Sequence, residues 1–98
     1  DRFSDSYLAP IAGINAAVSY EEAENYQEAI SAYTMVIDDF IDVSPEIPRV
    51  FFALGRLTES TGNDKEKALE YYNQLVENYP SSSWTNLARD RIIYLKID

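Results

Sequence analysis

The chain has 98 residues, 46% of them hydrophobic, and a formal net charge of -9 at pH 7. This length predicts one small domain over residues 1–98. Cysteine and histidine are both absent, which excludes disulfide bonds, thiolate metal sites, a thiol nucleophile and a histidine general base. No apolar run approaches the roughly 20 residues that span a bilayer, so we expect no membrane insertion by this segment.

The charge is unevenly distributed along the chain. Residues 1–44 contain nine acidic residues and one basic residue, whereas residues 45–98 contain eight acidic and seven basic residues. Because the first half repels a polyanion, we expect no nucleic-acid partner. The same charge attracts a basic protein or peptide partner. The alternative interpretation is that the acidic side chains only solvate an exposed surface.

The first half of the chain predicts two amphipathic helices. Pro10 suits the first turn of the first helix, because proline disrupts a helix interior. Small residues follow it at positions 12, 13, 16 and 17, and small side chains let two helix backbones approach closely. The second helix is predicted from an apolar stripe with intervals of three or four residues, formed by Tyr26, Ala29, Ile30, Tyr33, Ile37 and Phe40.

The next stretch predicts a second pair of helices. Ser44 followed by Pro45 is typical of a helix start, with serine as the cap. Gly62 suits the position just after a helix end, and Asn63 with Glu66 resembles a capping box that opens the next helix. The apolar stripe of that helix is formed by Ala68, Leu69, Tyr72, Leu75, Val76 and Tyr79.

A fifth helix is predicted from about Trp84 to Ile97, with Leu87, Ala88, Ile92 and Leu95 on its core side. The outer side carries Ile93, Tyr94 and Ile97, where a capping helix would be polar. We therefore predict that the natural protein continues beyond this helix, or that these residues and Trp84 contact another chain in a homo-oligomer. The alternative for Trp84 is packing against Tyr79.

The two pairs of helices are copies of one repeat. Pro10 aligns with Pro48 at a shift of 38 residues, and residues 29–33 align with residues 68–72 at a shift of 39. Periods of this length indicate stacked helical hairpins. We therefore predict an all-α solenoid of five helices, with a first repeat at residues 7–43, a second at 44–82, and a C-terminal capping or half-repeat helix at 83–98.

The second copy resembles a tetratricopeptide repeat. The resemblance rests on Leu54-Gly55, on Ala68 and Tyr72 four residues apart, and on Pro80, while Phe51 stands where that family favours tryptophan. The first copy departs from the pattern, since Glu24 replaces the turn glycine and Ile41 replaces the terminal proline. The resemblance implies a non-catalytic scaffold that binds proteins.

A finer similarity links the chain to bacterial cell-envelope members of that family. It rests on Tyr79-Pro80-Ser81 followed by Ser83, and on Ala88, Arg91 and Ile92 in the last helix. The similarity implies a fragment of a larger envelope-associated protein, located in the periplasm and tethered by a segment outside these residues. A cytoplasmic location is the alternative.

The same resemblance implies a binding groove along the first helix of each hairpin. The residues there that lie off the core stripe are Ile14, Val18, Glu21, Phe52, Arg56 and Glu59. We predict that they contact a partner segment, with the aliphatic and aromatic side chains as anchors. The alternative is that Ile14, Val18 and Phe52 belong to the core.

No arrangement of residues indicates an enzyme, a cofactor or a metal. The adjacent pairs Glu21-Glu22 and Asp38-Asp39 point to different faces of a helix, so we interpret them as solvated charges. Oxygen donors at Asp38, Asp42, Ser44 and Glu46 raise a calcium hypothesis, but the sharp-turn glycine of a calcium loop is missing.

Overall fold

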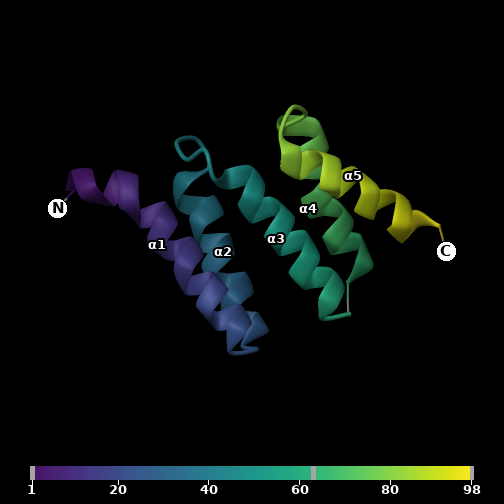
Figure 1. The fold of residues 1–98 in the computed structure, drawn as a ribbon, viewed down its shortest axis with the longest axis horizontal. Helices are drawn as coiled ribbons and strands as arrows, with labels where there is room; N and C mark the ends of the chain where they lie inside the picture. Colours follow the sequence, from purple (N-terminus) through teal and green to yellow (C-terminus); the bar gives the residue numbers. More distant parts are fainter. Residues whose placement is uncertain (1, 63, 98) are drawn as a thin grey trace. The chain divides into compact units, whose positions relative to one another are not determined.

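The computed structural model describes the backbone of residues 2–62 and 64–97, and the side chains of residues 10–62 and 64–97. Over these residues it consists of five helices without any strand (Figure 1), which confirms the all-α prediction. The helices are α1 (Arg2–Glu22), α2 (Tyr26–Phe40), α3 (Ile47–Ser60), α4 (Lys65–Asn78) and α5 (Ser83–Lys96).

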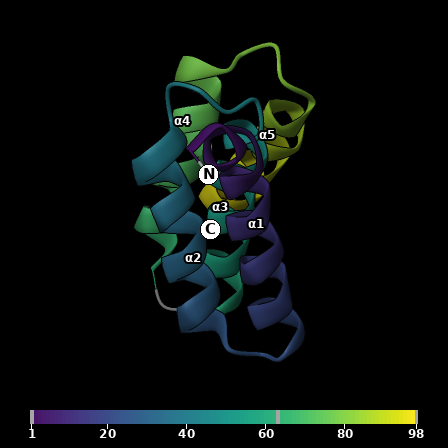
Figure 2. The same ribbon diagram turned by 90° about the vertical axis from the view of Figure 1, so that its left-hand side faces the viewer.

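The chain divides into two compact units, Asp1–Val50 and Phe51–Asp98, with the boundary inside α3. The N-terminal unit contains the α1–α2 hairpin, whose helices lie side by side in both views (Figure 1, Figure 2). The C-terminal unit contains most of α3 together with α4 and α5.

Close packing of α1 on α2 depends on small residues, as predicted. A Cβ atom on Gly13 would lie 2.7 Å from Cγ2 of Val36, so only glycine fits there. Ala17, Ala29 and Tyr33 of the same hairpin are also buried. Tyr26 was predicted in the same core stripe, but it is 39% exposed, because it is the first residue of α2 and lies beyond the buried contact.

The turn between α1 and α2 has a residue in the left-handed region. Glu24 has φ 63°, its N–H donates to the carbonyl of Glu21 at 2.9 Å, and the N–H of Asn25 donates to the carbonyl of Tyr20 at 2.8 Å. This pair of hydrogen bonds defines a Schellman motif, in which glycine is the favoured residue at the left-handed position. At the equivalent position in the second repeat, Gly62 has φ 82°, which confirms its prediction as a helix-end glycine.

Replacing Glu24 with glycine is expected to stabilise the protein by about 0.5–1 kcal/mol. Relief of the left-handed penalty outweighs the greater entropy that glycine gives the unfolded chain. The matched control is Gly62→Ala, which is expected to destabilise by about 1 kcal/mol although nothing lies within 4 Å of its new Cβ. Urea unfolding measures both changes, and a loss of stability in Glu24→Gly would contradict the prediction.

The C-terminal unit packs around Tyr72 of α4, which is fully buried. Gly55 of α3 lies against its ring, since a Cβ at that position would be 2.5 Å from Cε1 of Tyr72. Leu54, Leu75 and Ala88 are buried in the same unit. Leu87 was predicted on the core side of α5 but is exposed, because α5 turns Ala88 rather than Leu87 into the buried interior.

Several predicted helix ends are corrected. Pro10 lies inside α1, which begins at Arg2 rather than near the proline, and the first turns of α1 point away from the rest of the helix (Figure 1). Helix α3 begins at Ile47, two residues later than predicted, although the Ser44 hydroxyl does accept a bond from the N–H of Glu46 at 3.1 Å.

The start of α4 is capped by a residue that the sequence did not single out. The Asp64 side chain accepts a hydrogen bond from the N–H of Lys67 at 2.9 Å. The predicted cap, Asn63, lies outside the described residues. Helix α5 is capped by Ser82, whose hydroxyl accepts from the N–H of Trp84 at 3.1 Å.

Candidate protein-binding site

Three of the predicted groove residues belong to the N-terminal unit. Ile14 is 1% exposed, as expected if it belongs to the core. Val18 is half-buried. Glu21 is also half-buried, and its carboxylate accepts a hydrogen bond from the Tyr33 hydroxyl at 2.7 Å. Partner contact therefore remains a prediction for Val18 and Glu21, with the Glu21 carboxylate already engaged by Tyr33.

The other three predicted groove residues belong to the C-terminal unit. The half-buried Phe52 ring packs between two other rings, with centroids 5.7 Å from Tyr72 and 5.5 Å from Trp84. Phe52 therefore joins α3 to α4 and α5 inside this unit. Arg56 is exposed, and its contact with a partner stays a prediction. Trp84 packs against Phe52, while Tyr79 packs against Phe51 at 6.2 Å.

Glu59 is held within the unit by a network of charged and polar groups. The Arg91 guanidinium of α5 donates to both carboxylate oxygens of Glu59, at 2.8, 3.1 and 3.2 Å. The Tyr72 hydroxyl donates to the same carboxylate at 3.3 Å. Arg91 also lies over the Tyr94 ring, 4.5 Å from its centroid. Glu59 was predicted on a groove rim. In the structure its carboxylate instead joins α3 to α5 through Arg91.

Burial and the charge of Glu59 together raise the pKa of the Tyr72 hydroxyl. Desolvation, followed by the neighbouring Glu59 charge, raises the pKa of Tyr72 well above its ordinary value of 10.0. The hydrogen bonds that Arg91 donates to the Glu59 carboxylate raise the pKa of Arg91. No local sequence pattern relates the members of this network, because they are 13 to 32 residues apart.

The raised pKa of Tyr72 predicts a loss of stability in alkali. Above about pH 10 the unfolded state has released the phenol proton while the folded state retains it, so the free energy of unfolding falls as pH rises. Tyr72→Phe removes this titration. We expect unfolding measured from pH 8 to about pH 11 to decline less steeply in the variant than in the wild type. Parallel declines would contradict the prediction, since all other ionisations are shared.

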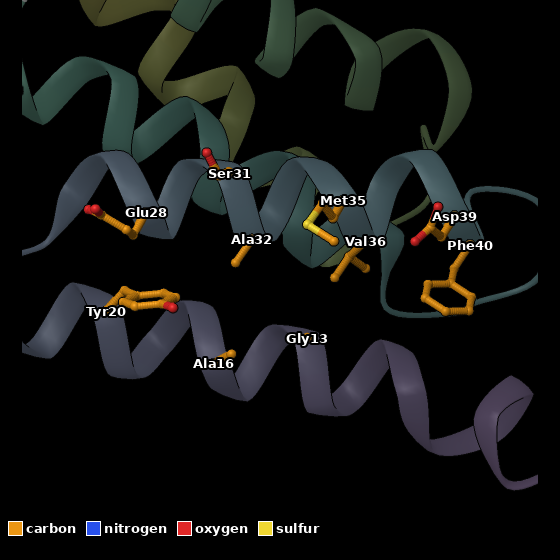
Figure 3. Close-up of a pocket in the computed structure, with 10 residues that line it drawn as sticks. All are labelled: Gly13, Ala16, Tyr20, Glu28, Ser31, Ala32, Met35, Val36, Asp39 and Phe40. Carbon is orange, nitrogen blue, oxygen red and sulfur yellow. The ribbon is translucent and has the colours of Figure 1, made fainter. Parts of the chain in front are cut away.

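An open apolar feature lies on the N-terminal unit. A cavity of about 480 Å³ separates one side of α1 from α2. Figure 3 shows Tyr20 and Phe40 at opposite ends of it, with small residues between them. Its lining residues are Gly13, Ala16, Tyr20, Glu28, Ser31, Ala32, Met35, Val36, Asp39 and Phe40.

The cavity combines an apolar interior with acidic ends. Met35, on its wall, is 62% exposed. Glu28 stands near the Tyr20 end and Asp39 near the Phe40 end (Figure 3). Small residues in the first helix had been predicted to permit close packing. Gly13 does so, while Ala16 is exposed and leaves the space open.

The outer side of α5 is a second exposed apolar surface. Ile93 and Tyr94 are 63% and 62% exposed, and Ile97, just beyond the helix, is 76% exposed. Among the described residues, no helix has the length and hydrophobicity to cross a bilayer. The cavity and the α5 surface are both exposed apolar features with the properties of protein-contact sites.

Consecutive helical hairpins with one repeating pattern define a helical-repeat protein. The chain belongs to the tetratricopeptide repeat family, because the family model of that name matches residues 12–40 and 49–82, well over half of the chain. This confirms the predicted resemblance and indicates a module for protein–protein interaction. No curated protein and no solved structure gives a significant match.

Proposed function

We propose that this chain is a non-catalytic protein-interaction module that binds a helical segment of a partner in the cavity of the α1–α2 hairpin. The observation that carries the proposal is the exposed apolar cavity of about 480 Å³ on a tetratricopeptide repeat chain. Apolar side chains projecting from an amphipathic helix are the usual occupants of such a groove.

The charge around the cavity specifies the chemistry of the partner. Glu28 and Asp39 stand at its two ends, and α2 carries three acidic residues and no basic residue. Residues 1–44 as a whole carry nine acidic residues and one basic residue. A helix with aliphatic anchors flanked by lysine or arginine is therefore the favoured occupant, while an acidic helix is repelled.

Two designed peptides test this proposal. Each is an amphipathic helix with isoleucine anchors three or four residues apart, one flanked by lysines and the other by glutamates. We expect the lysine peptide to bind in titration calorimetry with a Kd of about 10–100 µM, and the glutamate peptide at least about tenfold more weakly. Binding should weaken as salt is raised.

One variant and its matched control locate the binding surface. Ala16→Arg fills the cavity from an exposed helix position and should abolish binding of the lysine peptide. Ala12→Arg makes the same change at an exposed position of α1 that does not line the cavity, and should leave binding intact. Circular dichroism checks that both variants fold. Failure of both peptides to bind, or equal effects of the two variants, would contradict the proposal.

We further propose that the module works in a bacterial cell envelope, as part of a longer tethered protein. The support is the similarity carried by Tyr79-Pro80-Ser81 and by Ala88, Arg91 and Ile92. Fractionation of the source cells, with detection by an antibody against this domain, tests the location. Recovery in the cytosolic fraction alone would rule it out.

A further inference from the structure

Helix α5 has the chemistry that the cavity is proposed to select. Ile93 and Ile97 are four residues apart and both strongly exposed, so they form one apolar stripe. Arg89 and Lys96 are exposed along the same side, within about 60° of Ile93 around the helix, and so is the acidic residue Asp90. With Arg91 and the single acid Asp90, α5 carries three basic residues and one acidic residue.

The acidic ends of the α1–α2 cavity are complementary in charge to the basic residues of this stripe. The acidic residues Glu28 and Asp39 are separated by 11 positions of α2, a rise of about 16 Å, whereas Arg89 and Lys96 are separated by seven positions of α5, about 10 Å. The long side chains of arginine and lysine span the difference between these two separations. Between the acids, Ala16 and Ala32 line the space into which isoleucine side chains fit.

We propose that α5 of one copy docks in the α1–α2 cavity of a second copy, so that chains associate head to tail. This inference rests on the proposed function and names the partner as a second copy of the chain. The two surfaces are different, so the contact is heterologous. Each added copy presents another cavity and another α5, and association therefore continues beyond a dimer.

The contact is expected to be weak. It joins one helix face to one groove, which is at the small end of the range of protein interfaces. We expect a Kd of about 10–100 µM per contact. In sedimentation velocity the average mass of the wild type should rise with concentration beyond that of a dimer between about 10 µM and 1 mM. Raising salt from about 0.05 to 0.5 M should reduce it.

A mixing experiment distinguishes head-to-tail contact from a symmetric α5–α5 dimer. Ala16→Arg blocks the cavity and leaves α5 intact, whereas Ile93→Ser with Ile97→Ser blocks α5 and leaves the cavity intact. We expect each variant alone to be monomeric and their equimolar mixture to form a 1:1 complex and nothing larger. The matched controls, Ala12→Arg and Leu87→Ser, alter exposed positions outside the two surfaces and should associate like the wild type.

Charge reversal provides an independent test of the contact. Glu28→Lys with Asp39→Lys should abolish self-association, as should Arg89→Glu with Lys96→Glu in a separate chain. Mixing the two should restore association beyond a 1:1 complex, because the reversed cavity meets the reversed α5 while the unaltered cavity meets the unaltered α5, so that the two chains alternate. A mixture that stops at a 1:1 complex would show that the reversed pair does not associate. Absence of a complex in this mixture would overturn the role given to these four residues.

Other outcomes overturn the inference as a whole. If Ala16→Arg alone still dimerises, the contact is α5 to α5. If the wild type is monomeric at 1 mM, no such contact forms. In either case the proposed function survives if the lysine peptide binds the cavity, and it fails separately if that peptide does not bind.

Discussion

Gly55→Ala is expected to lower the free energy of unfolding by about 2–3 kcal/mol. At an exposed helix position the same substitution would raise the free energy of unfolding, because alanine is favoured over glycine in a helix interior by about 1 kcal/mol. The reversal comes from the contact with Tyr72, whose Cε1 would lie 2.5 Å from the new Cβ, with Cδ1 and Cζ at 2.8 Å. All three distances are shorter than van der Waals contact allows.

The Tyr72 ring has no direction in which to withdraw. It is fully buried, its hydroxyl donates to Glu59, and the ring packs at a tilt against Phe52. Relief of the clash therefore requires α3 and α4 to separate, which removes buried apolar contact elsewhere in the unit.

A double variant tests this cause. In the background Tyr72→Leu, where the ring is absent, Gly55→Ala should cost much less than in the wild type or should stabilise. Urea unfolding of the four proteins measures the coupling between the two positions. If Gly55→Ala alone stabilises the protein, the close approach of α3 to Tyr72 is wrong.

Arg91→Ala is expected to cost about 2 kcal/mol, the second large effect. The Glu59 side chain is only 13% exposed and loses every contact with the guanidinium, retaining only the Tyr72 hydroxyl. A carboxylate left nearly buried without its partner is costly, although the 40% exposure of Arg91 limits the loss through solvent screening. Arg91→Lys should recover little, because an ammonium does not reproduce the paired contacts.

The double variant Glu59→Gln with Arg91→Ala should be more stable than the sum of the two single effects predicts. Removing the charge of Glu59 removes the penalty for leaving it unpaired. Arg49→Ala is the matched control, since its ion pair with Glu46 at 3.6 Å is exposed on both sides. We expect it to change stability by less than about 0.5 kcal/mol. Equal losses for Arg49→Ala and Arg91→Ala would contradict the role assigned to the network.

The helices could be predicted from the sequence because the patterns that indicate them are local. Intervals of three or four residues in the apolar stripes, the glycine at position 62 and the repeat of 38 to 39 residues all come from backbone geometry within one helix or one turn. The same local pattern suggested the family, which the match to both repeats confirms. Pro10 was wrongly predicted to lie in the first turn of its helix. A proline usually disrupts a helix interior, but α1 contains Pro10 in its interior.

The environments of the candidate site residues were decided by tertiary structure. Periodicity shows that a helix has an apolar side, but which residues become covered depends on the angle at which a neighbouring helix packs. That angle buries Ile14, exposes Leu87 and places Phe52 between two rings. It also opens the cavity beside Ala16.

The sequence by itself therefore determined an all-α chain of repeated hairpins, its acidic first half and the apolar outer side of α5. Only the tertiary structure decided that Glu59 is bound by Arg91, and that the first hairpin carries an apolar cavity with acidic ends. The physical reason is that backbone preferences act between residues close in sequence. Cavities and ion pairs form between side chains that only packing brings together.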